Sequence, residues 1–168
     1  MKAATHTVGA LAAGSAAVYL NWAPQAVEQD VFQAAVFIGS LMFGGLLPDI
    51  CQPNSWMGRR LKATSYIVFK LVGHRTLTHS LVGTAIVFIL TGLIPGLTGT
   101  VMQTGITAGV ISHILLDMLT PKGVHLFFPV RYNVRFPFGK LTGSKPGEFL
   151  IFMLLSFFFI NGIWRLIA

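Results

Sequence analysis

Long apolar stretches alternate with polar segments along the whole chain. Each stretch approaches the roughly 20 residues that a helix needs to cross the bilayer core, and Pro95-Gly96 marks a tight turn between two of them. The pattern predicts an all-α integral membrane bundle of about five transmembrane helices in a single domain, residues 1–168. The predicted spans are about 5–20, 31–47, 75–94, 98–119 and 149–167.

The polar connections carry an uneven share of the basic residues. Eleven of the 12 Lys and Arg residues lie near the N-terminus or in and beside the loops 49–74 and 120–148. The positive-inside rule therefore makes that side cytoplasmic, with the N-terminus inside and the C-terminus outside. Within the first loop, residues 66–72 are apolar but too few to cross, so we expect them at the membrane interface or in a re-entrant turn.

Composition agrees with a membrane protein and excludes an ordinary soluble domain. Hydrophobic residues make up 54% of the chain and charged residues 10%, whereas soluble domains carry about 25% charged residues. We interpret the net charge of +7 as basic residues that set the membrane topology and contact anionic lipid headgroups. No nucleic-acid partner is expected. The single cysteine, Cys51, excludes an internal disulfide.

Side chains that can bind a metal gather at the predicted cytoplasmic face. The topology was predicted from Lys and Arg alone, so this gathering of His and Asp is an independent observation. Ionisable groups at membrane depth are costly and usually functional. Their mixture of nitrogen and oxygen ligands suits Zn²⁺, or Mn²⁺ or Fe²⁺, in a site of one or two ions. The candidate ligands are His6, Asp49, His74, His79, His113 and Asp117, and His125 stays unassigned.

The spacing of these residues leaves alternatives open. His113 and Asp117 lie four apart on one helix face, where they can share an ion or merely hydrogen-bond to each other. His74 and His79 are five apart, about 140° around a helix, so His74 would have to reach the site from the loop. Asp49 follows Pro48, and a Pro-Asp pair is also common in turns that end helices, so Asp49 need not be a ligand.

Basic residues beside these ligands are candidates for phosphate binding. Arg75 stands where a helix is expected to begin, and a helix N-terminus favours anions. Lys122 and Arg131 are candidate helpers in the second basic loop. Residues 127–136 interleave aromatic and basic side chains, a pattern that fits a gate over the site or an interfacial anchor.

At these residues the sequence resembles the YdjM family of bacterial inner-membrane proteins, described as metal-dependent hydrolases. The resemblance implies a multi-pass protein of the bacterial inner membrane with its site facing the cytoplasm. The family commonly carries an acid where this chain has Cys51, so a thiolate replaces that ligand or one ion is lost. The ligand order also resembles zinc-dependent phospholipase C and P1-type nucleases, an analogy only. The matching stretches are His6, Leu46-Leu47-Pro48-Asp49, Gly73-His74-Arg75, Thr78-His79-Ser80, Ser112-His113 and Leu116 to Pro121.

The combined prediction is a membrane-embedded hydrolase that cleaves a phosphoester or phosphodiester of a lipid at the cytoplasmic face. A water activated by the metal would attack, and Asp49 would be a ligand or the general base. The predicted partners are membrane lipids, including a phosphate-containing lipid substrate. Two other classes stay open: a transporter of metal ions or protons, and a non-enzymatic protein with a structural metal or a haem held between His79 and His113.

Overall fold

The computed structural model describes residues 1–73, 75–137 and 144–167 and confirms an all-α fold. Short 3₁₀ turns, η1 (Leu47–Cys51) and η2 (Leu77–His79), extend or precede two of the helices. The helices are α1 (Ala3–Tyr19), α2 (Ala26–Gln29), α3 (Val31–Leu46), α4 (Trp56–Arg60), α5 (Lys62–Val72), α6 (Leu81–Gly92), α7 (Gly96–Met118) and α9 (Lys145–Ile167).

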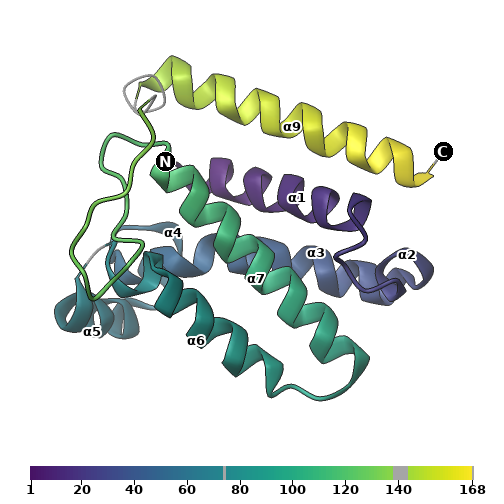
Figure 1. The fold of residues 1–168 in the computed structure, drawn as a ribbon, viewed down its shortest axis with the longest axis horizontal. Coiled ribbons are helices and arrows are strands. Elements are labelled where there is room, and N and C mark those ends of the chain that lie inside the picture. The colour runs from purple at the N-terminus through teal and green to yellow at the C-terminus, as the bar shows by residue number, and fades with distance from the viewer. Residues whose placement is uncertain (74, 138–143, 168) are drawn as a thin grey trace.

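Helices α1, α3, α6, α7 and α9 lie side by side and alternate in direction (Figure 1). Helix α7 packs against α1, α3 and α6, and α9 packs on α1. The N-terminus, α4 and α5 lie at one end of the bundle, and the C-terminus lies at the other (Figure 1). This arrangement agrees with the predicted topology, in which the two termini lie on opposite sides.

In the described part of the chain, three helices are long and apolar enough to cross a membrane. They are Val31–Cys51, which joins α3 to η1, then Gly96–Met118 and Lys145–Gly162. The other two predicted spans are shorter, because α1 has 17 residues and α6 has 12. At 1.5 Å per residue α6 reaches about 18 Å, less than the roughly 30 Å hydrocarbon core.

The third predicted span differs from the structure at its start, where we expected one helix from Arg75. Arg75 adopts a positive φ of 59°, η2 follows, and α6 begins only at Leu81. The Ser80 side chain caps α6 by accepting a hydrogen bond from the Gly83 amide. Because the helix is interrupted here, the His79 side chain lies in the protein interior, where it is fully buried.

Close packing of α3 on α7 fixes the position of the site. A side-chain carbon added at Gly44 would lie 2.2 Å from the Ile106 carbonyl oxygen, and one at Gly109 would lie 2.4 Å from the Leu41 carbonyl oxygen. Small residues that let two backbones approach in this way are typical of membrane helix interfaces. The backbone of α3 therefore comes near enough to α7 for their polar groups to meet.

Candidate metal centre

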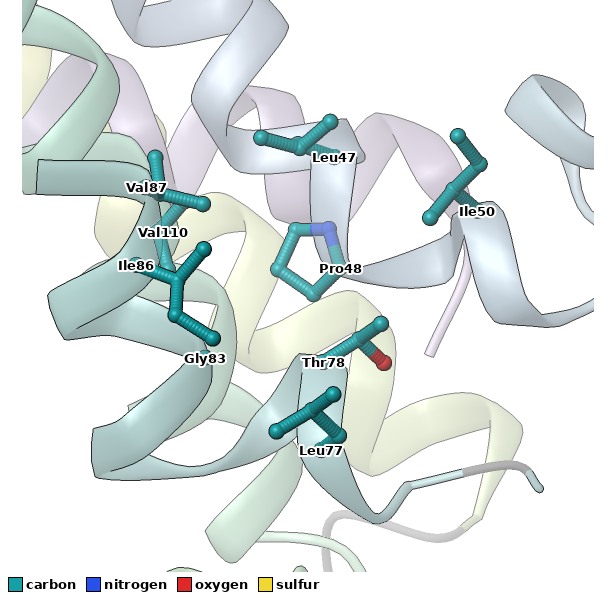
Figure 2. A pocket seen from close by; sticks show the side chains of 9 residues that line it. All are labelled: Leu47, Pro48, Ile50, Leu77, Thr78, Gly83, Ile86, Val87 and Val110. Atoms are coloured by element: carbon teal, nitrogen blue, oxygen red, sulfur yellow. The ribbon is translucent and has the colours of Figure 1, made fainter. Parts of the chain in front are cut away.

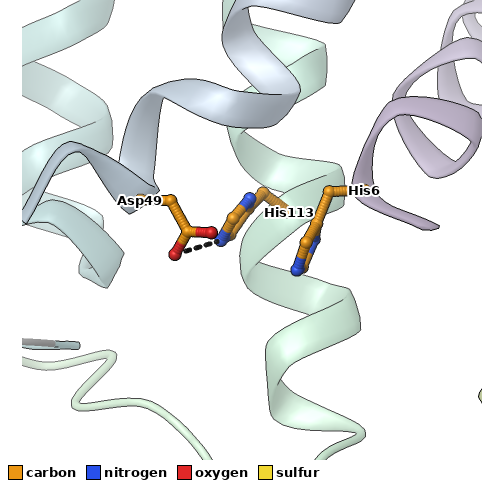
Figure 3. A group of neighbouring side chains, drawn as sticks. All are labelled: His6, Asp49 and His113. Atoms are coloured by element: carbon orange, nitrogen blue, oxygen red, sulfur yellow. Dashed lines mark ion pairs between the residues drawn. The ribbon is translucent and has the colours of Figure 1, made fainter. Parts of the chain in front are cut away.

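Five candidate ligands converge from four separate parts of the chain. His6 comes from the start of α1, Asp49 from η1, His79 from η2, and His113 and Asp117 from the last turns of α7. Figure 3 shows His6, Asp49 and His113 pointing toward one another from three different elements. All but Asp49 are at most 1% exposed, and the Asp49 side chain is 21% exposed.

Three of these side chains surround one point at distances suited to a metal ion. The Nε2 atoms of His79 and His113 are 3.2 Å apart, and Asp117 Oδ2 lies 3.4 Å from the first and 3.8 Å from the second. Two ligands of a tetrahedral ion are about 3.3 Å apart when each metal–nitrogen bond is about 2.0–2.1 Å. The three atoms therefore fit the face of such a site with small adjustments.

Asp49 and His6 complete the surroundings of this point. Asp49 Oδ1 lies 3.8 Å from Nε2 of both His79 and His113. His6 Nε2 lies 3.6 Å from Asp117 Oδ1, the second oxygen of that carboxylate. His6 also stacks on His113, with ring centroids 3.7 Å apart and an interplanar angle of 13°. His6, Asp49 and His113 thus form a second group with metal-ligand spacing that shares His113 with the first.

Hydrogen bonds outside the cluster orient the imidazoles. His113 Nδ1 lies 2.7 Å from the Gly45 carbonyl oxygen, which can only accept, so Nδ1 carries the proton and Nε2 presents its lone pair to the cluster. His79 Nδ1 lies 3.0 Å from Thr78 Oγ1. His79 sits in η2, outside the membrane-crossing helices, and burial lowers the pKa of its side chain to about 4. Its imidazole is therefore neutral near pH 7, the form that binds metal.

Arg75, a predicted phosphate ligand, contacts the cluster through its guanidinium group. Its Nη2 lies 2.9 Å from Asp117 Oδ2, and its Nη1 donates to Thr120 Oγ1 and to the Gly123 carbonyl oxygen. The Arg75 carbonyl oxygen in turn accepts from the backbone amide of His125. The guanidinium therefore orients Asp117 and offers its buried, unbonded Nε as a further donor.

Two buried atoms of the cluster lack hydrogen-bond partners among the described residues. These atoms are Asp117 Oδ1 and His6 Nδ1. The nearest polar groups to Asp117 Oδ1 are His6 Nε2 at 3.6 Å and the Met1 ammonium at 3.8 Å, both beyond hydrogen-bond distance. A buried carboxylate oxygen without a hydrogen bond is costly, and a closer cation would remove the cost. The residues present thus fit a divalent ion, because their donor set is imidazole and carboxylate.

A polar cavity of about 220 Å³ is lined by three of the candidate ligands, His6, Asp49 and Asp117, whereas His79 and His113 do not line it. Lys122 and Arg131 are exposed and do not line this cavity, and His74 falls outside the described residues. The phosphate role of the two basic residues and the ligand role of His74 stay predictions. The cavity is lined by Met1, His6, Asp49, Gln52, Asn54, Ser55, Arg75 and Asp117.

An apolar pocket of about 180 Å³ lies behind the cluster. Figure 2 shows Pro48 of η1 near the middle of the lining, with Ile86 of α6 to one side and Thr78 of η2 below it. Pro48 and Thr78 directly precede Asp49 and His79 in the chain. The pocket therefore flanks the ligands with apolar side chains and holds no candidate ligand of its own.

Sequence reasoning missed the groups that support the ligands. These groups are the Gly45 carbonyl, the Thr78 hydroxyl and the Thr120 hydroxyl. Glycine and threonine are common residues, and nothing local in the sequence shows that these ones contact His113, His79 or Arg75. Thr78 and Thr120 stood inside stretches already singled out, but neither was assigned a role there. Cys51, where the resembled family carries an acid, is fully buried and belongs to neither ligand group.

Comparisons with known proteins agree with this membrane fold. The chain matches the family described as YdjM inner membrane protein over residues 1–167. It is 35% identical to the uncharacterized protein YvsG of Bacillus subtilis over 152 residues, 90% of this chain and 88% of that protein. It is 37% identical to inner membrane protein YdjM of Escherichia coli, and equally to that of Shigella flexneri, over 126 residues.

The YdjM matches cover 71% of this chain and 61% of the relatives, so the aligned part spans less than two thirds of their length. No solved structure matches the chain. The family match over nearly the whole sequence and the membrane-length helices together establish an inner membrane location. This chain belongs to the YdjM family of inner membrane proteins.

Proposed function

We propose that this protein is a membrane-embedded, metal-dependent hydrolase that cleaves a phosphoester of a lipid at the cytoplasmic membrane face. The observation that carries the proposal is the convergence of three imidazoles and two carboxylates from four elements in one cluster, of which His6, Asp49 and Asp117 line the polar cavity. Buried imidazole and carboxylate groups in a membrane bundle are expensive unless they bind something. Their spacing matches that of ligands around one ion.

The site holds a single ion in this proposal. His113 can bind only one cation, because its Nδ1 is committed to the Gly45 carbonyl oxygen and only Nε2 faces the cluster. The two groups that share His113 are therefore alternatives and not two simultaneous sites. His79, His113 and Asp117 are the ligands in this proposal, since their ligand atoms lie closest together.

The other residues have distinct tasks. When bound, a divalent ion here polarises a phosphoryl oxygen and makes water a better nucleophile near neutral pH. Asp49 is the part-exposed acid on the cavity wall, so it orients the attacking water and takes its proton. Arg75 directs Asp117 at the cluster through its Nη2 atom and, as a residue of the cavity wall, donates a hydrogen bond to a phosphate oxygen in this proposal.

The geometry favours this function over haem binding. Two imidazoles on opposite sides of a haem iron would hold their nitrogens about 4 Å apart, given metal–nitrogen bonds of about 2.0 Å. The two Nε2 atoms of His79 and His113 are 3.2 Å apart, and Asp117 lies beside both. A carboxylate next to neighbouring imidazoles suits Zn²⁺, Mn²⁺ or Fe²⁺ instead.

The test is phosphate release from a panel of lipid phosphomonoesters and phosphodiesters by purified protein, with each divalent metal supplied in turn. His113→Ala removes a ligand and Asp49→Asn removes the proposed base, so both are expected to lower turnover at least about 100-fold. Arg59→Gln, at an exposed position that does not line the cavity, serves as the control. Release that persists in both site variants contradicts the hydrolase proposal.

A further inference from the structure

A second and larger hollow adjoins the polar cavity. It has a volume of about 540 Å³, within the roughly 300–1,000 Å³ typical of ligand pockets. The apolar pocket of Figure 2, at about 180 Å³, falls below that range. We call the larger hollow the apolar groove, and it is lined by Ala3, Ala4, Thr7, Met42, Phe43, Leu46, Trp56 and Met57.

The apolar groove and the polar cavity share two walls. The first turns of α1 carry His6 on the cavity side and Ala3, Ala4 and Thr7 on the groove side. The segment 52–57 lines the cavity with Gln52, Asn54 and Ser55 and then lines the groove with Trp56 and Met57. A molecule with one polar end and one apolar end can therefore lie across both.

The groove also opens beside a membrane-crossing helix. Met42 and Phe43 are 41% and 47% exposed, and they belong to the segment Val31–Cys51 that is long enough to span. At that depth the surroundings are hydrocarbon and not water. An acyl chain can thus enter the groove sideways from the bilayer without first crossing an aqueous layer.

We propose that the apolar groove holds the hydrocarbon chain of a lipid phosphate whose headgroup occupies the polar cavity. This inference rests on the proposed function and deepens it, because it names an amphiphilic substrate and the residues that select its chain. The cavity is lined by Arg75 and by three candidate ligands, His6, Asp49 and Asp117, whereas Thr7 is the only hydroxyl-bearing side chain among the described residues that line the groove. Ala4, Met42 and Trp56 are the chain-selecting positions.

Fluorescence of Trp56 gives a direct test that does not need hydrolysis. With Trp22→Phe and Trp164→Phe, Trp56 is the remaining tryptophan. The protein is placed in phosphatidylcholine nanodiscs that contain a small fraction of either phosphatidate or phosphatidylcholine with dibrominated acyl chains. Brominated phosphatidate is expected to quench Trp56 saturably and at least about threefold more than brominated phosphatidylcholine at the same fraction.

The variant Ala4→Phe fills the groove and is expected to remove this headgroup-dependent difference. The matched control is Ala35→Phe, at an exposed position of α3 that does not line the groove. Equal quenching by the two brominated lipids overturns the proposal, since the groove would then face bulk lipid. Absence of quenching by either lipid also overturns it, since protein would then cover the groove.

A parallel assay separates failure of the groove from failure of the hydrolase. Phosphate release is compared for long-chain phosphatidate and soluble glycerol phosphate, and Ala4→Phe is expected to lower the ratio of the two rates at least about tenfold. Selective quenching without any release would leave a lipid-binding groove and reject the hydrolase. Release from both substrates with a ratio indifferent to Ala4→Phe would reject the groove and leave the hydrolase.

Discussion

The Nε2 atoms of His79 and His113 lie 3.2 Å apart, although 34 residues separate the two histidines in the sequence. Two neutral imidazoles can hold that distance with a shared proton or with a shared cation. His113 carries its proton on Nδ1, which donates to the Gly45 carbonyl oxygen, so a shared proton would have to come from His79 Nε2. Asp117 Oδ2, 3.4 Å from His79 Nε2, adds negative charge at the same point and favours the cation.

The Thr78 hydroxyl offers the first test. With a cation on His79 Nε2, the Nδ1 proton is donated to Thr78 Oγ1, 3.0 Å away. Replacing Thr78 by Val removes that acceptor and is expected to weaken metal affinity about 10- to 100-fold, as loss of such supporting bonds usually does. Competition with a fluorescent chelator measures the affinity. Thr91→Val, whose hydroxyl bonds to the Val87 and Phe88 carbonyl oxygens of α6, should bind like wild type. A similar loss in that variant would mean that the effect does not come from the bond to His79.

Arg75 and Asp117 form a buried ion pair whose disruption should cost stability. Arg75→Gln removes the nearer of the two cations beside the buried Asp117 carboxylate and leaves the Met1 ammonium 3.8 Å away, and breaking such a buried pair typically costs about 3–5 kcal/mol. Thermal unfolding in detergent, followed by circular dichroism without added metal, measures the loss. Added Zn²⁺ should restore part of it, because an ion replaces the missing positive charge. Arg131→Gln is the surface control, and equal unfolding curves for the two variants would deny the pair any structural role.

The glycine contact between α3 and α7 makes a matched pair of substitutions possible. Gly44→Ala would place a methyl group 2.2 Å from the Ile106 carbonyl oxygen and should destabilise the protein by about 1–3 kcal/mol. Gly39→Ala, in the same helix with nothing within 4 Å, should instead stabilise it by about 0.5–1 kcal/mol. Unfolding midpoints in one detergent give the comparison. Equal shifts would mean that the two helices do not approach as described.

Substitution of His6 distinguishes a site that holds one ion from a site that holds two. If His79, His113 and Asp117 hold the only ion, His6→Ala should keep nearly full metal occupancy, whereas His79→Ala should lose it. Elemental analysis of the purified variants gives the occupancy. Wild-type protein with two ions per chain, falling to one in His6→Ala, would show instead that both ligand groups are filled.

Much of the fold could be predicted because the lipid bilayer requires every backbone polar group of a spanning segment to be hydrogen-bonded internally. Apolar stretches of membrane length had to be helices, and the described helices occupy all five predicted stretches. The gathering of His6, Asp49, His79, His113 and Asp117 followed from topology alone, since alternate helix ends meet at one face. The start of the third stretch was wrong, because the turn before α6 depends on the positive φ of Arg75 and on capping by Ser80, which apolar periodicity does not encode.

The role of Arg75 shows where sequence reasoning stops. Its position near a helix start suggested a free cation for phosphate, but two of its nitrogens are bound to Asp117, Thr120 and Gly123. Those partners lie 42 to 48 residues away along the chain. Only the packed arrangement of α7 and the loop after it brings them together, and no local pattern reports that arrangement.

The measurement that tests the central claim most directly is the divalent metal content of purified wild-type protein and of His113→Ala, after growth with Zn²⁺, Mn²⁺ or Fe²⁺ and with folding checked by circular dichroism. The account predicts about one ion per wild-type chain and almost none in the equally helical variant. Folded wild-type protein that takes up none of these metals, or a His113→Ala variant that keeps its full complement, would contradict it.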